Sequence, residues 1–235
     1  MSTRIEVVAD PVRDRCLLTT GHLAPRQLPG RPGVVRVALV AAGALLLAGD
    51  DVRIEVVVAG AVRLEILETA GTVAYGMRGG TARWDVDIRL TDGASLQWYA
   101  EPFVVAADAD VTRTTTAHLT TGCTAELRES LVLGRHGEQG GTLRTTTRAW
   151  LDDEPLLAED LDLSPTTRTG WAVLGPHRCL DTLTTLGFRL PTAPDTLQLE
   201  GTGSISRCLV SEQHQSALNP PAVECHTAEQ GVGHT

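Results

Sequence analysis

Short runs in which apolar and polar residues alternate recur along most of this chain, and they constrain its fold more than any other feature. In the run RWDVDIRL, residues 83–90, every second residue is apolar and the others are charged. Alternation with a period of two is typical of strands that bury one face. Turn-forming residues interrupt these runs at intervals of roughly 8 to 12 residues, the spacing of a layered all-β fold. The sequence therefore predicts an all-β protein made of many short strands.

The predicted strands follow one another as a meander, in which strands consecutive in sequence pair with each other. They span residues 4–9, 15–20, 34–47 (one strand or two), 53–58, 62–69, 83–90, 95–99, 111–119, 124–133, 142–151 and 156–163, with weaker strands at 196–199 and 204–210. Ala59-Gly60-Ala61 and Asp92-Gly93 predict tight hairpin connections between their flanking strands. The chain shows no fixed sequence period, so the residues alone do not predict a regular repeat.

Proline and glycine mark the segments that are predicted not to be strands. They crowd residues 25–33, which we interpret as a loop. A proline opens the segment from Pro176 to Leu186 and a glycine ends it, so a helix is predicted there. Residues 1–190 are predicted to form a single β-rich domain without a linker. Residues 191–235 are predicted to be a weakly structured C-terminal extension, disordered from Glu212 onward.

The charge balance excludes one class of partner. The formal net charge is −9, and all 20 basic residues are arginine. A nucleic-acid surface needs a stripe of clustered Lys and Arg, so nucleic-acid binding is not predicted. Hydrophobic residues make up 42% of the chain but aromatic residues only 3%, so the core is expected to consist of Val, Leu, Ile and Ala.

Cysteine usage and the lack of a long apolar segment predict a soluble cytoplasmic protein. The five cysteines are scattered, which fits neither a disulfide framework nor a zinc-finger spacing. We interpret them as buried thiols in a reducing compartment. The N-terminus has no apolar signal core. The longest apolar run, residues 34–48, is interrupted by Arg36 and is shorter than the ~20 residues that span a bilayer, so no membrane segment is predicted.

Common catalytic motifs are absent from the sequence. It contains no G-x-S-x-G elbow, P-loop, H-E-x-x-H or C-x-x-C. The glycine-rich segment at residues 76–82 lacks the lysine of a phosphate-binding loop and is interpreted as a strand connection. The seven histidines do not cluster, apart from two in the C-terminal tail. We therefore predict no catalytic residue and no tightly bound cofactor, and the chain is not predicted to be an enzyme.

An acid lies among apolar residues in the stretch ELRESLVLGRHGE, residues 126–138. In a strand, Glu129 would share a face with the leucines two residues before and after it. The residues alone leave three interpretations open: a charge that protects an edge strand, the lining of a wet internal passage, or a contact with a partner. This strand is predicted to pair with residues 142–151 as a hairpin, with Glu129 and Glu138 at its mouth.

Three blocks of sequence occur in a characteristic order: GALLLAGDDVRIEV (residues 43–56), GASLQWYAEPFVV (residues 93–105) and the stretch ELRESLVLGRHGE (residues 126–138). Weaker matches lie in LETAGTVAY (residues 67–75) and GPHRCLDTLTTLG (residues 175–187). In this order and spacing, the blocks resemble the UreD family of urease accessory proteins, also called UreH.

The resemblance implies a layered β-helical or sandwich-like arrangement of strands with one or two peripheral helices. It also implies a nickel-insertion chaperone scaffold that docks on apo-urease, recruits the accessory proteins UreF and the GTPase UreG, and guides Ni²⁺ through a water-filled passage to the urease active site. Ni²⁺ would be a transient cargo. Four residues match acids of the family and are implied to contact the passing ion: Asp50, Glu129, Glu138 and Asp160. Glu101 is a nearby acid without a match.

Carboxylates suit a passage because they hold Ni²⁺ more weakly than several His or Cys ligands do and leave water around the ion. A carboxylate in a dry core would be protonated, so such a passage must be wet. Two alternatives stay open: a pure protein-binding scaffold through which no metal passes, and a β-helical carbohydrate-active enzyme in which Glu129 and another acid form an acid/base pair. Carboxylates about 5–10 Å apart in an open groove would support the enzyme.

Overall fold

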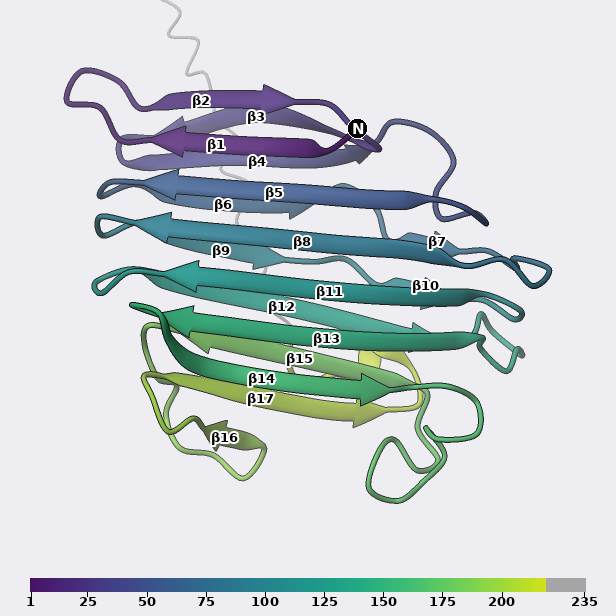
Figure 1. Ribbon diagram of the computed structural model, residues 1–235. Coiled ribbons are helices and arrows are strands. Elements are labelled where there is room, and N and C mark those ends of the chain that lie inside the picture. Colours follow the sequence, from purple (N-terminus) through teal and green to yellow (C-terminus); the bar gives the residue numbers. More distant parts are fainter. Residues whose placement is uncertain (219–235) are drawn as a thin grey trace, which may run out of the picture.

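The structure, a computed structural model that describes residues 1–218, consists of two β-sheets that pack face to face (Figure 1). Sheet A lies in front and contains β1 (Thr3–Val8), β2 (Arg15–Thr19), β5 (Asp51–Ala59), β8 (Ala82–Thr91), β11 (Asp110–Leu119), β13 (Thr142–Leu151) and β14 (Glu154–Asp162). Sheet B lies behind it and contains β3 (Leu23–Arg31), β4 (Val34–Ala41), β6 (Arg63–Glu68), β7 (Thr72–Ala74), β9 (Ser95–Tyr99), β10 (Phe103–Val105), β12 (Thr124–Leu133), β15 (Cys179–Leu186), β16 (Thr196–Gln198) and β17 (Gly203–Val210).

The chain passes repeatedly from sheet A to sheet B and back, so that it forms successive coils. β5, β8, β11 and β13 lie parallel and side by side in sheet A, and β4, β6, β9 and β12 do so in sheet B. Asp51 pairs with Arg83, Arg83 with Thr112, and Thr112 with Arg144, so successive coils contain 32, 29 and 32 residues. The predicted all-β, layered β-helical arrangement is confirmed.

The predicted meander is wrong for these coils. β5 and β6, β8 and β9, and β12 and β13 do not pair, because the two members of each pair lie in different sheets. Gly60, with a φ of 87°, and Asp92 and Gly93, with φ values of 59° and 80°, turn the chain from sheet A into sheet B. Tight turns with positive φ suit a hairpin, and here they form corners. Because the alternation of buried and exposed residues is the same in both arrangements, the local pattern does not distinguish them.

Two segments predicted not to be strands are strands. Residues 25–33, predicted as a loop, belong mostly to β3, which pairs antiparallel with β4 at the edge of sheet B. Proline is tolerated there because an edge strand leaves one row of N–H groups unpaired. The segment from Pro176 to Leu186, predicted as a helix, contains β15, which pairs along its whole length with β12 and β17. Its threonines fit a strand, and the two neighbours supply its backbone partners.

The predicted peripheral helices are also wrong for the described residues, where the 3₁₀ turn η1 (Gln213–Gln215) is the only helix. Within residues 1–218 no helix has the length and apolar character needed to cross a bilayer. β17 pairs with β15 across the predicted domain boundary at residue 190, so this part of the C-terminal extension belongs to sheet B. The segment predicted to be disordered begins at Glu212, and residues 219–235 of it lie outside the described residues.

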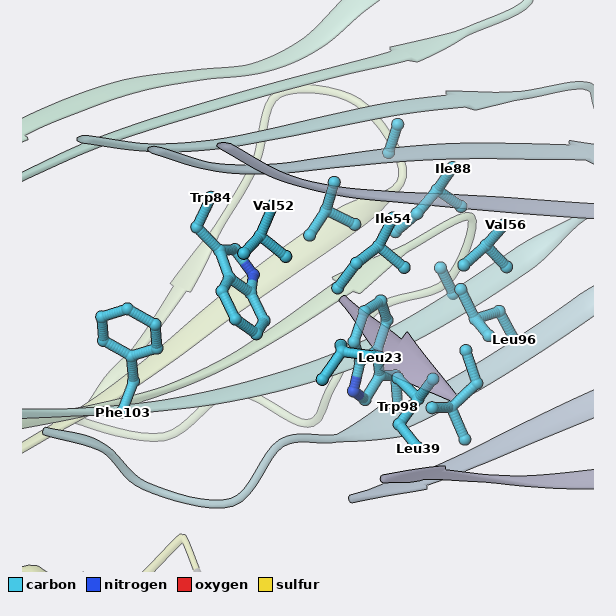
Figure 2. Close-up of a cluster of buried hydrophobic side chains, with 14 of the residues drawn as sticks. Leu23, Leu39, Val52, Ile54, Val56, Trp84, Ile88, Leu96, Trp98 and Phe103 are labelled. Carbon is cyan, nitrogen blue, oxygen red and sulfur yellow. The ribbon is translucent and has the colours of Figure 1, made fainter. Parts of the chain in front are cut away.

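The core lies between the two sheets and is built from the apolar positions of the alternating strands (Figure 2). Ile54 and Val56 of β5 and Ile88 of β8 come from sheet A, and Leu96 and Trp98 of β9 come from sheet B; all five are buried. Burying a large aliphatic side chain stabilises the fold by about 1.5–3 kcal/mol. The alternating runs seen in the sequence are therefore the main source of stability.

Candidate functional site

The layer between the sheets changes from apolar to polar toward its C-terminal strands. The inward positions of β5 are all buried valine and isoleucine. The inward positions of the later strands include charged and hydroxyl side chains: Arg113, Thr115, Glu129, Thr147, Glu159, Thr184 and Arg207. Polar groups inside a sandwich are stable only when they are hydrogen-bonded or wet. We refer to this set of residues, together with Glu68, as the polar route.

One ion pair of the polar route joins the two sheets. Arg113 of β11 donates a hydrogen bond from Nη2 to Glu129 Oε1 of β12, at 2.7 Å. The Arg113 side chain is only 9% exposed and that of Glu129 32%. The Arg113 guanidinium also lies over the Phe103 ring, 4.6 Å from its centroid, an attractive cation–π arrangement. Glu129 thus faces the interior, on the face that the pattern has it share with the neighbouring leucines.

A second ion pair crosses between the sheets at their C-terminal edges. Arg207 of β17 donates from Nη2 to both carboxylate oxygens of Glu159 on β14. Among the described residues, Arg113 Nε and Arg207 Nε are buried without a protein partner. Buried groups of this kind normally bind water, so we expect the polar route to be hydrated.

Glu68 is the third inward-facing acid. It ends β6 on the same face as Leu64 and Ile66. Trp98 Nε1 donates to its Oε1 at 3.1 Å, and the Glu101 backbone N–H donates to its Oε2 at 3.0 Å. Burial raises the pKa of Glu68 to about 7, against the lowering effect of these hydrogen bonds and of Arg113. Glu68 therefore keeps its proton to a higher pH than an exposed glutamate does.

Two neighbouring cavities meet at Glu68. The inner cavity lies between the sheets and has a volume of about 40 Å³. Arg113, Glu129 and hydroxyl groups of the polar route line it together with apolar side chains such as Trp98 and Leu127. The side cavity, of about 210 Å³, opens between residues 41–45 and 69–75. Glu68 and Trp84 line both. A single water needs about 10–15 Å³, so the inner cavity has room for a short file of waters.

The polar route contains residues that the sequence reasoning missed. Glu68 carried the same signal as Glu129, an acid on the apolar face of a strand, since it stands two residues after Ile66. Arg113, Glu159 and Arg207 carried no such signal, because the partners of their ion pairs are 16 and 48 residues away in sequence.

The structure does not bring the four predicted metal contacts together. Glu129 lines the inner cavity. Asp50 lies in the turn before β5, where its Oδ2 accepts a hydrogen bond from Leu47 N at 2.8 Å. Asp160 lies on the outer face of sheet A, 66% exposed and paired with Arg148, whose hydrogen bond lowers the pKa of the Asp160 carboxyl. The described part of the chain holds no group of three His, Cys, Asp or Glu side chains arranged to bind a metal.

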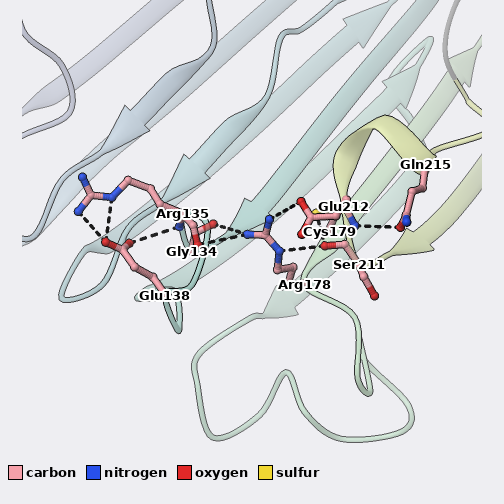
Figure 3. A network of polar contacts seen from close by, with 8 residues as sticks. All are labelled: Gly134, Arg135, Glu138, Arg178, Cys179, Ser211, Glu212 and Gln215. Carbon is pink, nitrogen blue, oxygen red and sulfur yellow. Dashed lines mark hydrogen bonds and ion pairs between the residues drawn. The ribbon is translucent and has the colours of Figure 1, made fainter.

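Glu138 lies in the loop after β12 (Figure 3). It does not line the inner cavity. Arg135 Nη2 is 2.7 Å from its Oε1, and this contact lowers the pKa of the Glu138 carboxyl. On the other side of the loop, Arg178 donates to Gly134 O at 2.7 Å and to Glu212 at 2.6 Å. Glu138 therefore organises a loop, and the unmatched acid Glu101 contributes only its backbone N–H to Glu68.

Comparison with known proteins identifies the family. A family model described as UreD urease accessory protein matches residues 20–219. Over 193 residues the chain is 45% identical to urease accessory protein UreD 1 of Streptomyces griseus subsp. griseus, covering 81% of this chain and 76% of the relative. It is 38% identical over 192 residues to UreD of Frankia casuarinae (76% and 59% covered) and 34% identical over 178 residues to UreD of Streptomyces coelicolor (74% and 70% covered). The chain belongs to the UreD family of urease accessory proteins.

Proposed function

We propose that this protein is a nickel-insertion chaperone scaffold of the cytoplasm. It docks on apo-urease, recruits UreF and UreG, and guides Ni²⁺ toward the urease active site. Nucleotide hydrolysis would belong to UreG, and this chain would carry no catalytic residue. The observation that supports the proposal most directly is the polar route, which places Glu129 and Glu68 on cavities inside an otherwise apolar sandwich.

The side chains around the inner cavity suit a passing ion better than a resident one. Glu129, Thr147 and Thr184 offer carboxylate and hydroxyl oxygens, and no described thiol or imidazole lines this cavity. Oxygen ligands hold Ni²⁺ more weakly than thiolates or several imidazoles and let it keep part of its water shell. An ion in such surroundings is released readily, which is what a passage requires.

Of the four residues predicted to contact Ni²⁺, the proposal retains Glu129. Asp50, Glu138 and Asp160 lie outside the inner cavity and already accept hydrogen bonds that explain their positions: from Leu47 N, from Arg135 and from Arg148. We propose no role for these three in the interior passage.

Urease activation tests the proposal. The chain is co-expressed with a urease operon that lacks its own copy of this protein, and nickel per active site is measured. The double variant Glu129→Ala, Asp50→Ala should co-purify with apo-urease but yield nickel-poor urease. The single variants should show that Glu129→Ala, and its neutral isostere Glu129→Gln, carry the loss. Asp87→Asn, on the outer face of sheet A, serves as the matched control, and normal nickel content with both Glu129 variants contradicts a passage at this residue.

The two alternatives make different predictions. A pure binding scaffold would co-purify with urease and deliver normal nickel content whatever stands at position 129. A carbohydrate-active enzyme would need its two acids in a groove that admits a sugar. Glu68 and Glu129 instead line a cavity of about 40 Å³ between the sheets, well below the ~300 Å³ of a small ligand site, so this geometry does not support the enzyme.

A further inference from the structure

Glu68 differs from the other two acids of the polar route in its partners. Glu129 is paired with Arg113 and Glu159 with Arg207, in each case a guanidinium from the opposite sheet. Glu68 accepts its hydrogen bonds from the indole N–H of Trp98 and the backbone N–H of Glu101, which are both uncharged. Within residues 1–218 it forms no ion pair with an arginine or histidine. Its carboxylate is therefore the one on this route that no arginine holds in an ion pair, although Arg113 is near enough to lower its pKa.

This difference decides which acid a mobile cation can approach. At Glu129 or Glu159 an incoming cation has to displace a guanidinium and leave it unpaired inside the protein, which is unfavourable. At Glu68 nothing charged has to move. Each Glu68 oxygen accepts one hydrogen bond and keeps a further lone pair for another contact.

The position of Glu68 also distinguishes it, because its side chain lies where the two cavities meet. It lines both the inner cavity and the side cavity, together with Trp84. The side cavity is lined elsewhere by small, apolar and threonine residues and by Tyr75, and it holds no other acid among the described residues. Of the charged side chains that the structure describes, Glu68 is therefore the one that lines both cavities.

We propose that Glu68 is the residue that selects cations at the junction of the two cavities: a divalent cation moving between them contacts the Glu68 carboxylate directly. This inference rests on the proposed function. Within the proposed passage, Glu68 marks the point at which an ion moves from one cavity to the other. Trp98 then has a positioning role, since the indole N–H fixes one oxygen of the carboxylate.

Trp98 makes the contact measurable. The chain has four tryptophans, so the indole N–H region of a ¹⁵N-labelled sample contains four signals, and Trp98→Phe assigns one of them. Mn²⁺ is the probe, because it prefers oxygen ligands and broadens signals near it. Sub-stoichiometric Mn²⁺ should broaden the signals of Trp84 and Trp98, and excess Ni²⁺ should reverse this. The signal of Trp171, which is 95% exposed and lines neither cavity, should stay sharp.

Variants of the full chain decide the outcome. Glu68→Gln keeps an oxygen that accepts from Trp98 but removes the charge, and should need at least tenfold more Mn²⁺ for the same broadening. Glu68→Asp should restore part of the effect. Asp87→Asn, on the outer face of sheet A, should behave like the unmodified chain. Equal broadening of Trp98 in the Glu68→Gln variant, or none in the unmodified chain, overturns the inference.

The nickel assay separates this inference from the proposed function. If Glu68→Gln loses the Mn²⁺ contact and also yields nickel-poor urease, both stand. If the contact is lost but urease receives its full nickel, Glu68 binds cations and the proposed passage is wrong. If Mn²⁺ never reaches Trp98 while Glu129→Ala still lowers the nickel content, the passage stands and the role of Glu68 is wrong.

Discussion

Arg113 and Glu129 tie the two sheets together from the inside, through a 2.7 Å hydrogen bond from Arg113 Nη2 to Glu129 Oε1. The guanidinium is almost completely buried and also packs on Phe103. A charged contact at this place has two effects. It keeps an acid inside the sandwich, and it makes the stability of the fold depend on both partners being present.

Removal of the carboxylate should therefore be costly. Glu129→Ala leaves the buried Arg113 without its partner and is expected to lower the free energy of unfolding by about 2 kcal/mol, less than for a fully buried pair because Glu129 is 32% exposed. Urea denaturation measures the change. Asp51→Ala removes the partner of the exposed Arg53 and should leave the urea denaturation curve nearly unchanged, because an exposed ion pair contributes little. Similar losses for both variants would show that the interior pair has no special weight.

Stability should depend on pH through Glu68. Burial raises its pKa from 4.5 to about 7, so between these values the folded chain holds a proton that the unfolded chain has released. The stabilisation is fully present below pH 4.5 and is lost as the pH rises through 7. At the acidic end Glu68→Gln should change the free energy of unfolding little. Above the folded pKa it should raise the free energy of unfolding by about 1–3 kcal/mol relative to the unmodified chain. Unfolding curves of both proteins across this range test the prediction, and parallel pH profiles would refute it.

A glycine substitution in the turn between β13 and β14 is expected to stabilise the fold. Asp152 and Asp153 have φ values of 49° and 66°, which glycine adopts more easily than aspartate, and Asp-Gly is a favoured hairpin turn. Asp153→Gly is expected to stabilise the fold by about 0.5–1 kcal/mol, seen as a rise in Tm. Asp152→Gly should give no gain, because the Asp152 carboxylate accepts a hydrogen bond from Thr121 N at 2.8 Å. A loss with Asp153→Gly would show that its side chain matters more than its backbone.

Close backbone approach at Gly141 leaves no room for a side chain. A Cβ there would lie 2.1 Å from Ala109 O, and Arg168 holds the Gly141 carbonyl at 2.6 Å, so the segment has little freedom to shift. Gly141→Ala should lower the free energy of unfolding by more than about 3 kcal/mol or prevent folding. At Gly43 an added Cβ meets nothing within 4 Å, and Gly43→Ala should leave thermal unfolding nearly unchanged. If both variants melt alike, the contact at Gly141 is less rigid than the structure indicates.

Strand content and buried faces could be read from the sequence, because alternation is a local property. Trp84 and Ile88 are buried where the pattern of residues 83–90 placed them. Strand pairing could not be read, since a glycine turn such as Asp92-Gly93 has the same local geometry in a hairpin and in a corner between sheets. β15 was mistaken for a helix because Pro176 and Gly187 resemble helix boundaries, while its backbone partners come from distant strands.

The site could be predicted only in part, for a similar reason. Glu129 stood out as an acid between leucines, but it was the resemblance to the family that singled it out as a metal contact; Glu68 offered the same local signal. Asp50 and Glu138 match the family blocks but serve turns and loops through contacts with Leu47 and Arg135. The arginines that form ion pairs with Glu129 and Glu159 come from other strands, and only the folded chain shows that Glu68 has no ion pair among the described residues.

Because β5, β8, β11 and β13 repeat one geometry, a whole coil of about 30 residues is the modular unit by which such a molecule can grow or shrink. Deleting a coil would shift all later strands by one inter-strand spacing, about 4.8 Å, and leave matching hydrogen-bonding edges to rejoin. Duplication or loss of a coil would thus change the reach of the interior without remaking either end, whereas a shorter insertion has to bulge outward at a corner.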